Sequence, residues 1–420
     1  MLFNTVCTVL LIFLKAFSLW FAITAVFCLM RPKSFARSQA KTRFACLIPA
    51  RNEEAVIGDI VRSLTSQRYP RELFDVYVIP NNCTDGTQEA ALAAGAKIIT
   101  CSGQVTCKGD ALRQAVDRLL IMDYDAFCIF DADNIVHHDF LSRMNDAVCA
   151  GARVAKARMS AKNPYDTAVT GCYGIYYSLF DSVFNRARAN IGLSAKLVGT
   201  GFAVHRQVLE KLGGWHTRTI AEDAEFSAIC AQLGERVFWV PEAVTYDEAP
   251  RTFRTSVTQR MRWSSGVMSV AQKKLPGLIC GIFKTNFLRC TDCVLFLCAP
   301  YVQILSMLLT VCRIVSELLT GGETGIIAPL LTAAGIGAAG MLTLAVVLAI
   351  MGGMKDRRIV KSVLLFPLFM ASWMPIQIVS LVHRTRNWHE IRHIGVIDAQ
   401  PGFKSVRDSG ELYRTGILKQ

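Results

Sequence analysis

The sequence lacks a regular spacing among its fifteen cysteines, several of which lie inside apolar runs. This argues against a disulfide framework and is typical of cysteines that act as small apolar residues in a reducing compartment. Cys290 and Cys293 form a CxxC pair without a second ligand pair nearby, so we do not expect a zinc site there. Internal repeats and low-complexity tracts are also missing from the chain.

No basic segment precedes the first apolar run. Val6 to Met30 are almost continuously apolar, with Lys15 as an interruption, and five basic residues follow between positions 31 and 43. A cleaved signal peptide has a basic segment before a shorter apolar stretch, which disfavours that alternative. The run is long enough to span a bilayer, and its basic flank predicts that the following residues are cytoplasmic.

Acidic residues are fewer than basic ones, 33 against 46, which gives a formal net charge of +13. The basic residues are scattered through the middle of the chain and gather beside apolar segments. That distribution fits the positive-inside rule and small phosphate-bearing ligands better than a nucleic-acid partner. With 52% hydrophobic residues, more than in a typical soluble domain, the composition predicts one large soluble domain plus membrane segments.

The middle of the chain alternates short apolar runs with amphipathic stretches of helical length. Strands are predicted at 44–48, 74–79, 97–100, 126–130 and 236–240, and helices at 55–67, 87–94 and 109–121. Strands that alternate with helices in this way indicate βαβ units, so we predict an α/β domain with a mostly parallel sheet.

Polar residues follow three of these strands at the point where each ends. Asp131 and Asp133 come directly after the strand at 126–130, while residues 49–54 and 81–86 follow the first two strands. Side chains two apart in an extended chain face the same side, so both carboxylates can meet one ligand. Alone, the two Asp residues are equally typical of an acidic turn, but three polar strand ends on one sheet edge predict a ligand crevice.

Two further segments are glycine-containing candidates for ligand contact. Lys108 and Gly109 open a predicted helix and suit a diphosphate, the alternative being that Lys108 is a solvated surface residue. Gly199 and Gly201 bracket part of an apolar segment whose backbone a ligand can approach closely.

Two helical segments add charged and aromatic candidates. Glu222 and Asp223 begin a predicted helix, where acidic residues also serve as plain N-terminal caps. Residues 253–273 predict a basic amphipathic helix on which Gln259 lies three and four residues from Arg262 and Trp263. Alone, this stretch is also typical of a membrane-surface helix.

The last third of the chain has the pattern of a membrane domain. Runs at 293–315 and 325–351 are long enough to span a bilayer. A third run, 363–382, contains Pro367 and Pro375. Counting it as a span places the basic tail outside, against the positive-inside rule, so it either spans against that rule or forms a Pro-bent re-entrant or interfacial element.

The predicted regions are an N-terminal membrane helix with its basic flank, a cytoplasmic α/β domain, an interfacial helix with membrane segments, and a basic tail. Their bounds are 1–43, 44–275, 276–384 and 385–420.

The ordered motifs resemble those of the membrane-integrated family 2 glycosyltransferases, which include cellulose, chitin and hyaluronan synthases and bacterial exopolysaccharide synthases. The similarity covers nearly the whole chain. It rests on Pro49–Glu54, Asn81–Asp85, Asp131–Asp133, Gly199–Ala203, Glu222–Asp223 and Gln259–Trp263.

The resemblance implies a GT-A fold, a nucleotide-sugar donor that is most often a UDP sugar, and a Mg²⁺ or Mn²⁺ ion. By the same resemblance Asp133 would bind the cation, and Asp223, beside Glu222, would be the general base. The implied donor-binding residues are Pro49, Ala50, Glu53, Asn81, Asp85, Lys108, Asp131 and Arg262. The implied acceptor-binding residues are Gly199, Thr200, Gly201, Gln259 and Trp263.

The chain departs from the family's pattern at two places. Asn81 and Asn82 stand where many relatives have a second acidic pair, and an amide oxygen accepts hydrogen bonds without carrying charge. Ala221 precedes the acidic motif where Thr is frequent, which removes a hydroxyl group.

The resemblance predicts an inverting transferase at the cytoplasmic face of the cell membrane, which extends a polysaccharide or another glycan through a β-linkage. A carboxylate would activate the acceptor hydroxyl, while the cation and Arg262 would stabilise the leaving diphosphate. Two alternatives stay open: a lipid glycosyltransferase that adds one sugar, as ceramide glucosyltransferase does, and a non-catalytic membrane protein that binds a nucleotide sugar. The bilayer is an expected partner, and a second copy or an accessory subunit is a further candidate.

Overall fold

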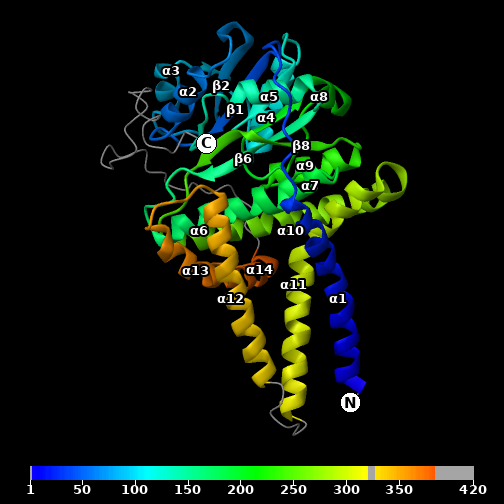
Figure 1. Cartoon of the computed structure of the whole chain (residues 1–420). Coiled ribbons are helices and arrows are strands. Elements are labelled where there is room, and N and C mark those ends of the chain that lie inside the picture. The colour runs from blue at the N-terminus through cyan, green and yellow to red at the C-terminus, as the bar shows by residue number, and fades with distance from the viewer. Residues whose placement is uncertain (1, 320–326, 384–420) are drawn as a thin grey trace. The chain divides into compact units, whose positions relative to one another are not determined.

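The computed structural model describes residues 2–319 and 327–383, so the predicted tail at 385–420 lies outside the described residues. The chain divides into two compact units, whose elements are coloured along the chain in Figure 1. The sheet unit consists of Lys33–Lys162 and Ser194–Glu248. The helical unit consists of Met1–Pro32, Asn163–Leu193 and the described part of Ala249–Thr385.

The sheet unit contains one eight-stranded sheet among the described residues, in the order β3-β2-β1-β4-β7-β6-β8-β5. Strands β3, β2, β1 and β4 are parallel, as are β6 and β8, whereas β7 is antiparallel to both of its neighbours and β5 to β8. The prediction of a mostly parallel sheet is therefore confirmed. The strands are β1 (Phe44–Ala50), β2 (Phe74–Pro80), β3 (Lys97–Ile98), β4 (Ala126–Ile129), β5 (Ile135–Val136), β6 (Val154–Ala161), β7 (Phe202–His205) and β8 (Val237–Asp247).

The helices of the sheet unit connect these strands. They are α2 (Ile57–Thr65), α3 (Thr87–Ala93), α4 (Lys108–Leu119), α5 (Phe140–Cys149), α8 (Arg206–Leu212) and α9 (Glu222–Gln232). The first three agree with the predicted helices to within two residues at each end, whereas α5 and α8 follow from no pattern noted above.

Strand β1 shows how the sequence positions the candidate residues. Its seven residues are all buried, and it pairs with β2 on one side and β4 on the other. A strand covered on both faces consists of an unbroken apolar run, which is why the segment Phe44–Ala50 has no alternation of polar and apolar residues. Because the three strands are parallel, the polar segments that follow them meet at one edge of the sheet.

The helical unit is built from long apolar helices and three short connecting elements. Its elements are α1 (Leu2–Val26), η1 (Phe27–Leu29), α6 (Ala168–Ser178), the π-helical η3 (Leu179–Asn185), α7 (Arg186–Asn190), α10 (Phe253–Lys284), α11 (Phe287–Leu319), α12 (Ile327–Met351), α13 (Ile359–Ala371) and α14 (Trp373–Val382).

The predicted division at residues 275 and 276 does not coincide with the compact units. It falls inside α10, and residues 163–193 belong to the helical unit. Helix α6 packs closely against α13, because a Cβ atom at Gly171 would lie 2.0 Å from the Ser362 hydroxyl oxygen. The helix is buried on nearly all sides, which ties this segment to the helical unit.

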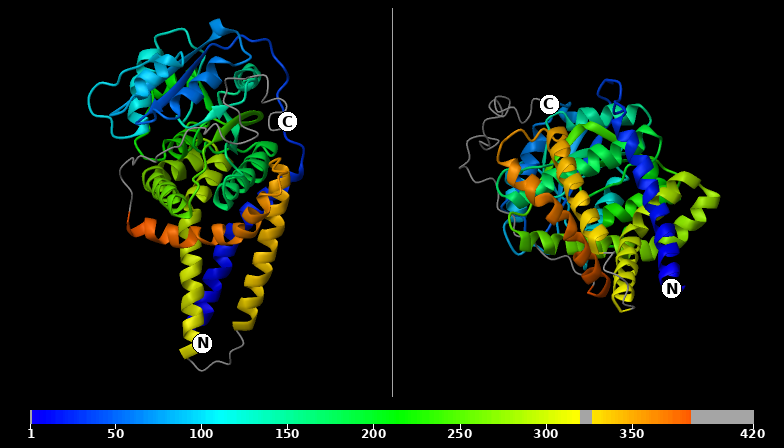
Figure 2. Two further views of the ribbon diagram at one scale, coloured as in Figure 1. Left: turned by 90° about the vertical axis from the view of Figure 1, so that its left-hand side faces the viewer. Right: turned by 60° about the horizontal axis from the view of Figure 1, so that its bottom comes forward.

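Four helical segments are long and apolar enough to cross a membrane, by length and composition, within the described residues. Three of them, α1, α11 and α12, run as columns in Figure 1, whereas α13 and α14 run across the columns in both Figure 1 and the left view of Figure 2. Residues 359–382 are thus bent between α13 and α14 and run across the columns, while their length and composition also suit a span, so both alternatives for the run at 363–382 stay predictions.

The bend between α13 and α14 lies at Ser372 and has two local causes. Pro375 lacks the N–H group that would bond the Ala371 carbonyl, which removes one helical hydrogen bond at the end of α13. The Arg260 guanidinium of α10 donates to the Phe369 carbonyl at 3.0 Å and to the Ser372 hydroxyl at 2.8 Å. These bonds satisfy acceptor groups at the end of α13, so the break is stabilised from the neighbouring helix.

A buried ion pair joins three elements of the helical unit. Asp292 of α11 accepts hydrogen bonds from Arg188 of α7, at 3.1 Å from Nε and 2.9 Å from Nη2, and from Trp20 Nε1 of α1 at 3.0 Å. Both charged side chains are only 1% exposed. The Arg188 guanidinium also lies 3.3 Å from the ring centre of Phe184. The bidentate geometry and the aromatic face offset the cost of burying these charges.

Replacing Asp292 with Ala is expected to destabilise the helical unit by about 3–5 kcal/mol, because Arg188 would stay buried without its partner. Thermal unfolding in detergent measures this loss. The double variant Arg188→Met/Asp292→Leu removes both charges and should recover most of the stability. An Asp292→Ala protein that melts with the wild type would show that the pair carries no stability.

Candidate active site

The polar segments after β1 and β2 are interlocked by hydrogen bonds. Glu53 N–H donates to the Thr87 hydroxyl at 2.8 Å, and Glu54 N–H donates to Asp85 at 3.1 Å. The side-chain amide of Asn81 donates to the Ala50 carbonyl at 3.0 Å. These bonds hold the two strand ends together, so the predicted meeting of polar segments at this sheet edge is observed.

Two residues of these segments have a backbone conformation that is unusual outside glycine. Asn52 and Asn82 have φ angles of 55° and 51°, in the left-handed region. The Asn52 side chain accepts from Thr84 N–H at 2.7 Å, and the Asn82 side chain donates to the Val105 carbonyl at 2.9 Å. Asparagine tolerates this region because its short amide bonds locally, so both positions suit it better than a branched residue.

Lys108 connects two acidic motifs that are far apart in the sequence. Its ammonium nitrogen lies 2.6 Å from Asp131 Oδ1 and 2.6 Å from Glu222 Oε1. Although burial alone lowers the pKa of Lys108, the two carboxylates raise it above its ordinary value, so the side chain is charged. The alternative of a solvated surface lysine is therefore excluded. Its part in binding a donor stays a prediction.

The acidic motif is held in place by the turn that precedes α9. Glu225 accepts from the backbone N–H groups of Arg218 and Thr219, both at 2.8 Å. The Trp215 ring stacks on Phe226 with ring centres 4.3 Å apart and planes 2° from parallel. These contacts pin the turn to the first two turns of α9 and thereby set the position of Glu222 and Asp223.

Asp223 is oriented by the glycine-containing loop before β7. The Gly199 N–H donates to Asp223 Oδ2 at 2.5 Å, and Gly199 has a φ of 64°, which a residue with a side chain rarely adopts. Burial raises the pKa of Asp223, with the Gly199 hydrogen bond acting in the opposite direction. A buried carboxylate with a raised pKa is a stronger base than an exposed one.

The other two residues of this loop have internal contacts. The Thr200 hydroxyl accepts from Asp131 N–H at 3.0 Å, and the Thr200 carbonyl accepts from Lys156 at 2.6 Å. Gly201 leaves no room for a side chain, since its Cβ would lie 2.4 Å from Thr245 Cγ2. The loop thus joins Asp131 to Asp223. Contact of Gly199, Thr200 and Gly201 with an acceptor stays a prediction.

A group of carboxylates surrounds the first strand end. Burial, followed by the charges of Asp133 and Asp131, raises the pKa of Glu53 to about 9. Burial, followed by the charges of Asp131 and Glu248, raises the pKa of Asp133 to about 7, although Lys162 lowers it. Burial is the larger cause of both shifts, and the neighbouring carboxylates add to it because like charges disfavour one another's ionisation.

These carboxylates suit a divalent cation. Carboxylate oxygens are hard ligands of the kind that Mg²⁺ and Mn²⁺ prefer. A divalent ion would offset the repulsion that, after burial, contributes to the raised pKa values of Glu53 and Asp133. The donor set therefore fits the expected metal, with Asp133 as the predicted ligand.

Sequence reasoning assigned no role to three residues that border Asp133. The Asn134 side chain is completely buried and donates to Asp133 at 3.3 Å and to Asp247 at 2.9 Å. Glu248 follows Asp247 and lies 3.8 Å from Lys162. Glu248 and Lys162 follow β8 and β6, and the parallel pairing of these two strands brings them together. The sequence carried no local signal for Glu248 and Lys162, because β6 was not predicted and the predicted strand at 236–240 ends well before Glu248.

Glu248→Gln is expected to weaken binding of Mn²⁺ by about tenfold, because one carboxylate of the group would lose its charge. Titration calorimetry with Mn²⁺ measures the change. Glu242→Gln, which removes a carboxylate from the same strand β8, is the matched control and should bind like the wild type. Equal affinities for Glu248→Gln and the wild type would place Glu248 outside the cation's ligands.

His137 and His138, just beyond the paired Asp residues, group with Asp139. Their ligand atoms and a carboxylate oxygen of Asp139 lie within 4.8 Å of one another, and all three residues are half-buried. The Asp139 N–H donates to His137 Nδ1 at 3.3 Å.

The predicted residues Gln259, Arg262 and Trp263 lie on α10 of the helical unit. Gln259 is buried, and Trp263 packs edge-on against Tyr173 with ring centres 5.9 Å apart. Trp263 also stacks near Trp373 of α14 at 6.4 Å. The structure thus brings Lys108, Asp131, Glu222 and Asp223 together in the sheet unit, while the joint action of these residues with α10 stays a prediction.

Comparison with known proteins agrees with this arrangement of motifs. A family model described as "Glycosyltransferase like family 2" matches residues 42–266, which is more than half of the chain. The chain belongs to glycosyltransferase family 2. Members of this family are sugar-transferring enzymes. That the residues described above form the transferase site stays a prediction.

Curated relatives of this family 2 glycosyltransferase match over somewhat more than half of its length. A "Probable glycosyltransferase YdaM" of Bacillus subtilis is 30% identical over 253 residues, 58% of this chain and 60% of the relative. A "Beta-monoglucosyldiacylglycerol synthase" of Nostoc sp. is 30% identical over 252 residues, 56% of this chain and 52% of the relative. The match thus covers between half and three fifths of the length of these relatives.

A solved structure shows the same fold. The mannosyltransferase PcManGT from Pyrobaculum calidifontis, in complex with GDP-Man and Mn²⁺, has a TM-score of 0.60 at 18% identity. The likeness covers 84% of this chain and 97% of that chain. The predicted GT-A fold, together with membrane-type helices, is therefore confirmed for this family 2 glycosyltransferase.

Proposed function

We propose that this enzyme transfers one sugar, with inversion, from a UDP-sugar to a hydroxyl group of a membrane lipid at the cytoplasmic face. Transfer to a growing glycan is the second candidate. The two differ in the acceptor and share the donor, the cation and the base.

The donor side of the proposal rests on the edge formed by β1, β2 and β4. Asp131 and the segments around Glu53 and Asn81 would hold the nucleotide, and Asp133 would hold a Mg²⁺ or Mn²⁺ ion. The buried oxygen Oδ1 of Asn81 has no hydrogen-bond partner, so it is suited to accept from a nucleobase N–H. The chemistry that a bound cation supplies is stabilisation of charge on the leaving diphosphate.

The transfer step rests on Asp223 and Lys108. Asp223, oriented by Gly199, would take the proton of the acceptor hydroxyl as that oxygen attacks the sugar. Lys108, beside Asp131, would place its positive charge near the diphosphate. Attack opposite the departing phosphate inverts the anomeric centre, so an α-linked donor would give a β-linked product.

The lipid acceptor is favoured by one observation in the helical unit. Helices α1, α11 and α12 run as columns, and large apolar side chains such as Phe13, Leu308 and Ile336 are exposed along them. Side chains that face outward suit contact with lipid, and among the described residues these columns offer little wall for a polymer channel. The polar acceptor group of a lipid needs no such channel.

The proposed topology agrees with the positions of the basic residues. With α1, α11 and α12 as spans and α13–α14 lying along the surface, the basic residues at 31–43 and 355–361 fall on one side. That side is the cytoplasm by the positive-inside rule.

Product analysis tests the function. The purified full chain is reconstituted in vesicles that contain diacylglycerol, supplied with Mn²⁺ and a series of radiolabelled nucleotide sugars, and extracted with organic solvent. We expect one labelled glycolipid with a single sugar, from a UDP-sugar. Labelled material that stays water-soluble and is larger than an oligosaccharide would establish glycan synthesis instead. Absence of any transfer with every donor would contradict both candidates.

A further inference from the structure

The turn between α10 and α11 lies in a stretch of chain without acidic residues. Between Glu248 and Asp292 the sequence contains eight Lys and Arg residues and no Asp or Glu. Four of the basic residues lie in what we call the α10–α11 corner, residues 273–289, where α10 ends and α11 begins. They are Lys273, Lys274, Lys284 and Arg289.

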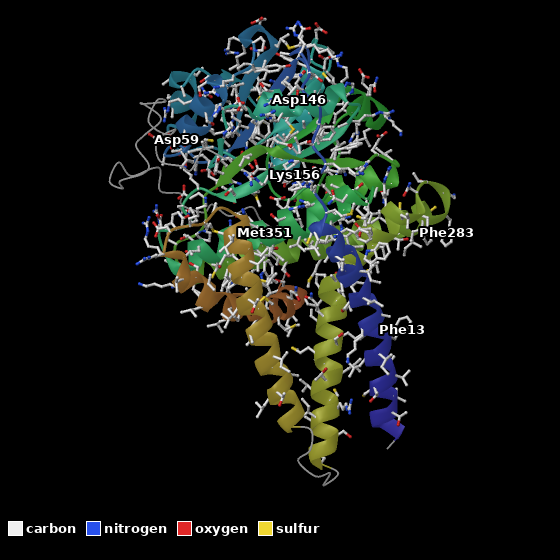
Figure 3. The ribbon with its side chains drawn as sticks, in the orientation of Figure 1. Phe13, Asp59, Asp146, Lys156, Phe283 and Met351 are labelled. Carbon is white, nitrogen blue, oxygen red and sulfur yellow. The ribbon has the colours of Figure 1, made fainter. Side chains whose placement is uncertain are left out.

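The corner also exposes large apolar side chains. Phe283 is 83% exposed and Phe287 is 62% exposed, and Ile279 and Leu288 are about half exposed. Figure 3 shows Phe283 at the outer end of α10, away from the columns formed by α1, α11 and α12. Exposed aromatic and aliphatic side chains beside lysines are the pattern of a segment that lies in a membrane interface.

We propose that the α10–α11 corner binds the headgroups of anionic lipids, and that this contact controls the enzyme's activity by positioning α10. Lys273 and Lys284, both exposed, would lie at the lipid phosphates, and Phe283 and Phe287 would enter the acyl-chain boundary. The inference rests on the proposed function, because sugar transfer is one of its two readouts.

The covalent structure favours lipid over other partners. Helix α11 begins at Phe287 and is one of the candidate spans, so the corner is tied to the membrane surface within a few residues. A second copy of the chain would bring another strongly basic molecule against this basic surface, since the net charge is +13. An acidic protein would match the charge but would leave the four apolar side chains without a hydrophobic partner.

A continuous helix connects the corner to the transferase motif. Helix α10 carries Gln259, Arg262 and Trp263 near its beginning and Lys284 at its end. With a rise of about 1.5 Å per residue, Trp263 and Lys284 are separated by roughly 30 Å of helix, with Pro276 between them. Because the two segments belong to one helix, fixing its end at the lipid surface restricts its beginning, so lipid charge at the corner is expected to influence the position of the motif residues.

The test compares two double variants that lose the same charge. Wild type, Lys273→Gln/Lys284→Gln and the control Lys355→Gln/Arg357→Gln are reconstituted in phosphatidylcholine vesicles with 0–40% phosphatidylglycerol. Lys355 and Arg357 are exposed basic residues at the turn between α12 and α13 of the same unit. Transfer from the labelled donor is measured at each lipid composition and at two salt concentrations.

We expect phosphatidylglycerol to stimulate the wild type and the control several-fold, with less stimulation at high salt. The Lys273→Gln/Lys284→Gln protein should match their activity in pure phosphatidylcholine but need about tenfold more phosphatidylglycerol for half-maximal stimulation. Equal stimulation of all three proteins would overturn the proposal, and an equal loss in both variants would assign the effect to general surface charge.

A second readout needs no activity. In Phe283→Trp, brominated phosphatidylglycerol should quench the added fluorescence more than brominated phosphatidylcholine does, with the wild-type signal subtracted. Preferential quenching without sugar transfer would reject the proposed function and keep the lipid site. Equal quenching by both lipids would reject the lipid site whatever the activity is.

Discussion

Asp223→Asn is expected to lower the rate of sugar transfer by about a hundred- to ten-thousand-fold, because an amide cannot accept the proton of the acceptor hydroxyl. The substitution keeps the shape of the side chain and the oxygen that accepts from Gly199 N–H, so the loop before β7 should hold its place. The donor's dissociation constant, measured by calorimetry with UDP and Mn²⁺, should therefore change little while turnover is lost.

The control for this experiment is Asp117→Asn on the exposed side of α4, which also changes one carboxylate to an amide. Its turnover should equal that of the wild type. If Asp223→Asn retained normal turnover, the base would have to be another residue, and Glu222 would be the next candidate. If donor binding fell together with turnover, Asp223 would serve binding and not proton transfer.

Asp133→Asn is expected to abolish the dependence of the enzyme on Mn²⁺ and to reduce transfer by a hundredfold or more, because the predicted cation ligand loses its charge. The effect of the same substitution on the stability of the cation-free protein is expected to be neutral or favourable. In the absence of cation, Asp133 lies among carboxylates that repel it, so removing its charge should leave the melting temperature equal or higher.

Thermal unfolding separates these two effects. Adding Mn²⁺ should raise the melting temperature of the wild type, since a ligand that binds only the folded state stabilises it. The same addition should leave Asp133→Asn unchanged. A cation-induced shift of equal size in both proteins would show that Asp133 is no ligand. If metal-free Asp133→Asn melted at a lower temperature than the metal-free wild type, the Asp133 carboxylate would have stabilising partners within the chain.

The parts of the fold that the sequence predicted correctly share one property, which is that their signal is local. Phe44–Ala50 is an unbroken apolar run because β1 is covered on both faces, and α2, α3 and α4 follow in turn with amphipathic spacing. Strand β6 went unnoticed because Lys156 and Arg158 interrupt its apolar pattern. Lys156 is nevertheless buried, and its ammonium group donates a hydrogen bond to the Thr200 carbonyl, which lies 44 residues away in the chain.

The candidate site likewise contains residues that a local sequence signal indicated and residues that had no such signal. Asp131, Asp133, Glu222 and Asp223 were recognisable because each follows a strand or opens a helix, where polar groups stand out from their surroundings. Glu248 and Lys162 were not, since only the pairing of β8 with β6 brings them together. The solvated-surface alternative for Lys108 could be dismissed only once Asp131 and Glu222 were both found within 2.6 Å of its ammonium group.

By itself, the sequence determined an α/β sheet with polar strand ends and a set of long apolar helices, because hydrophobic periodicity is a property of the chain alone. The resemblance of its ordered motifs to those of family 2 glycosyltransferases added the expectation of a transferase. The tertiary structure alone decided the partners of the buried charges Lys108, Arg188 and Asp292 and the course of residues 359–382. Both features depend on contacts between groups that are far apart in the sequence. The free energy of a buried charge or of an unpaired carbonyl is set by the partner it contacts in the folded chain, and not by the residues beside it in the sequence.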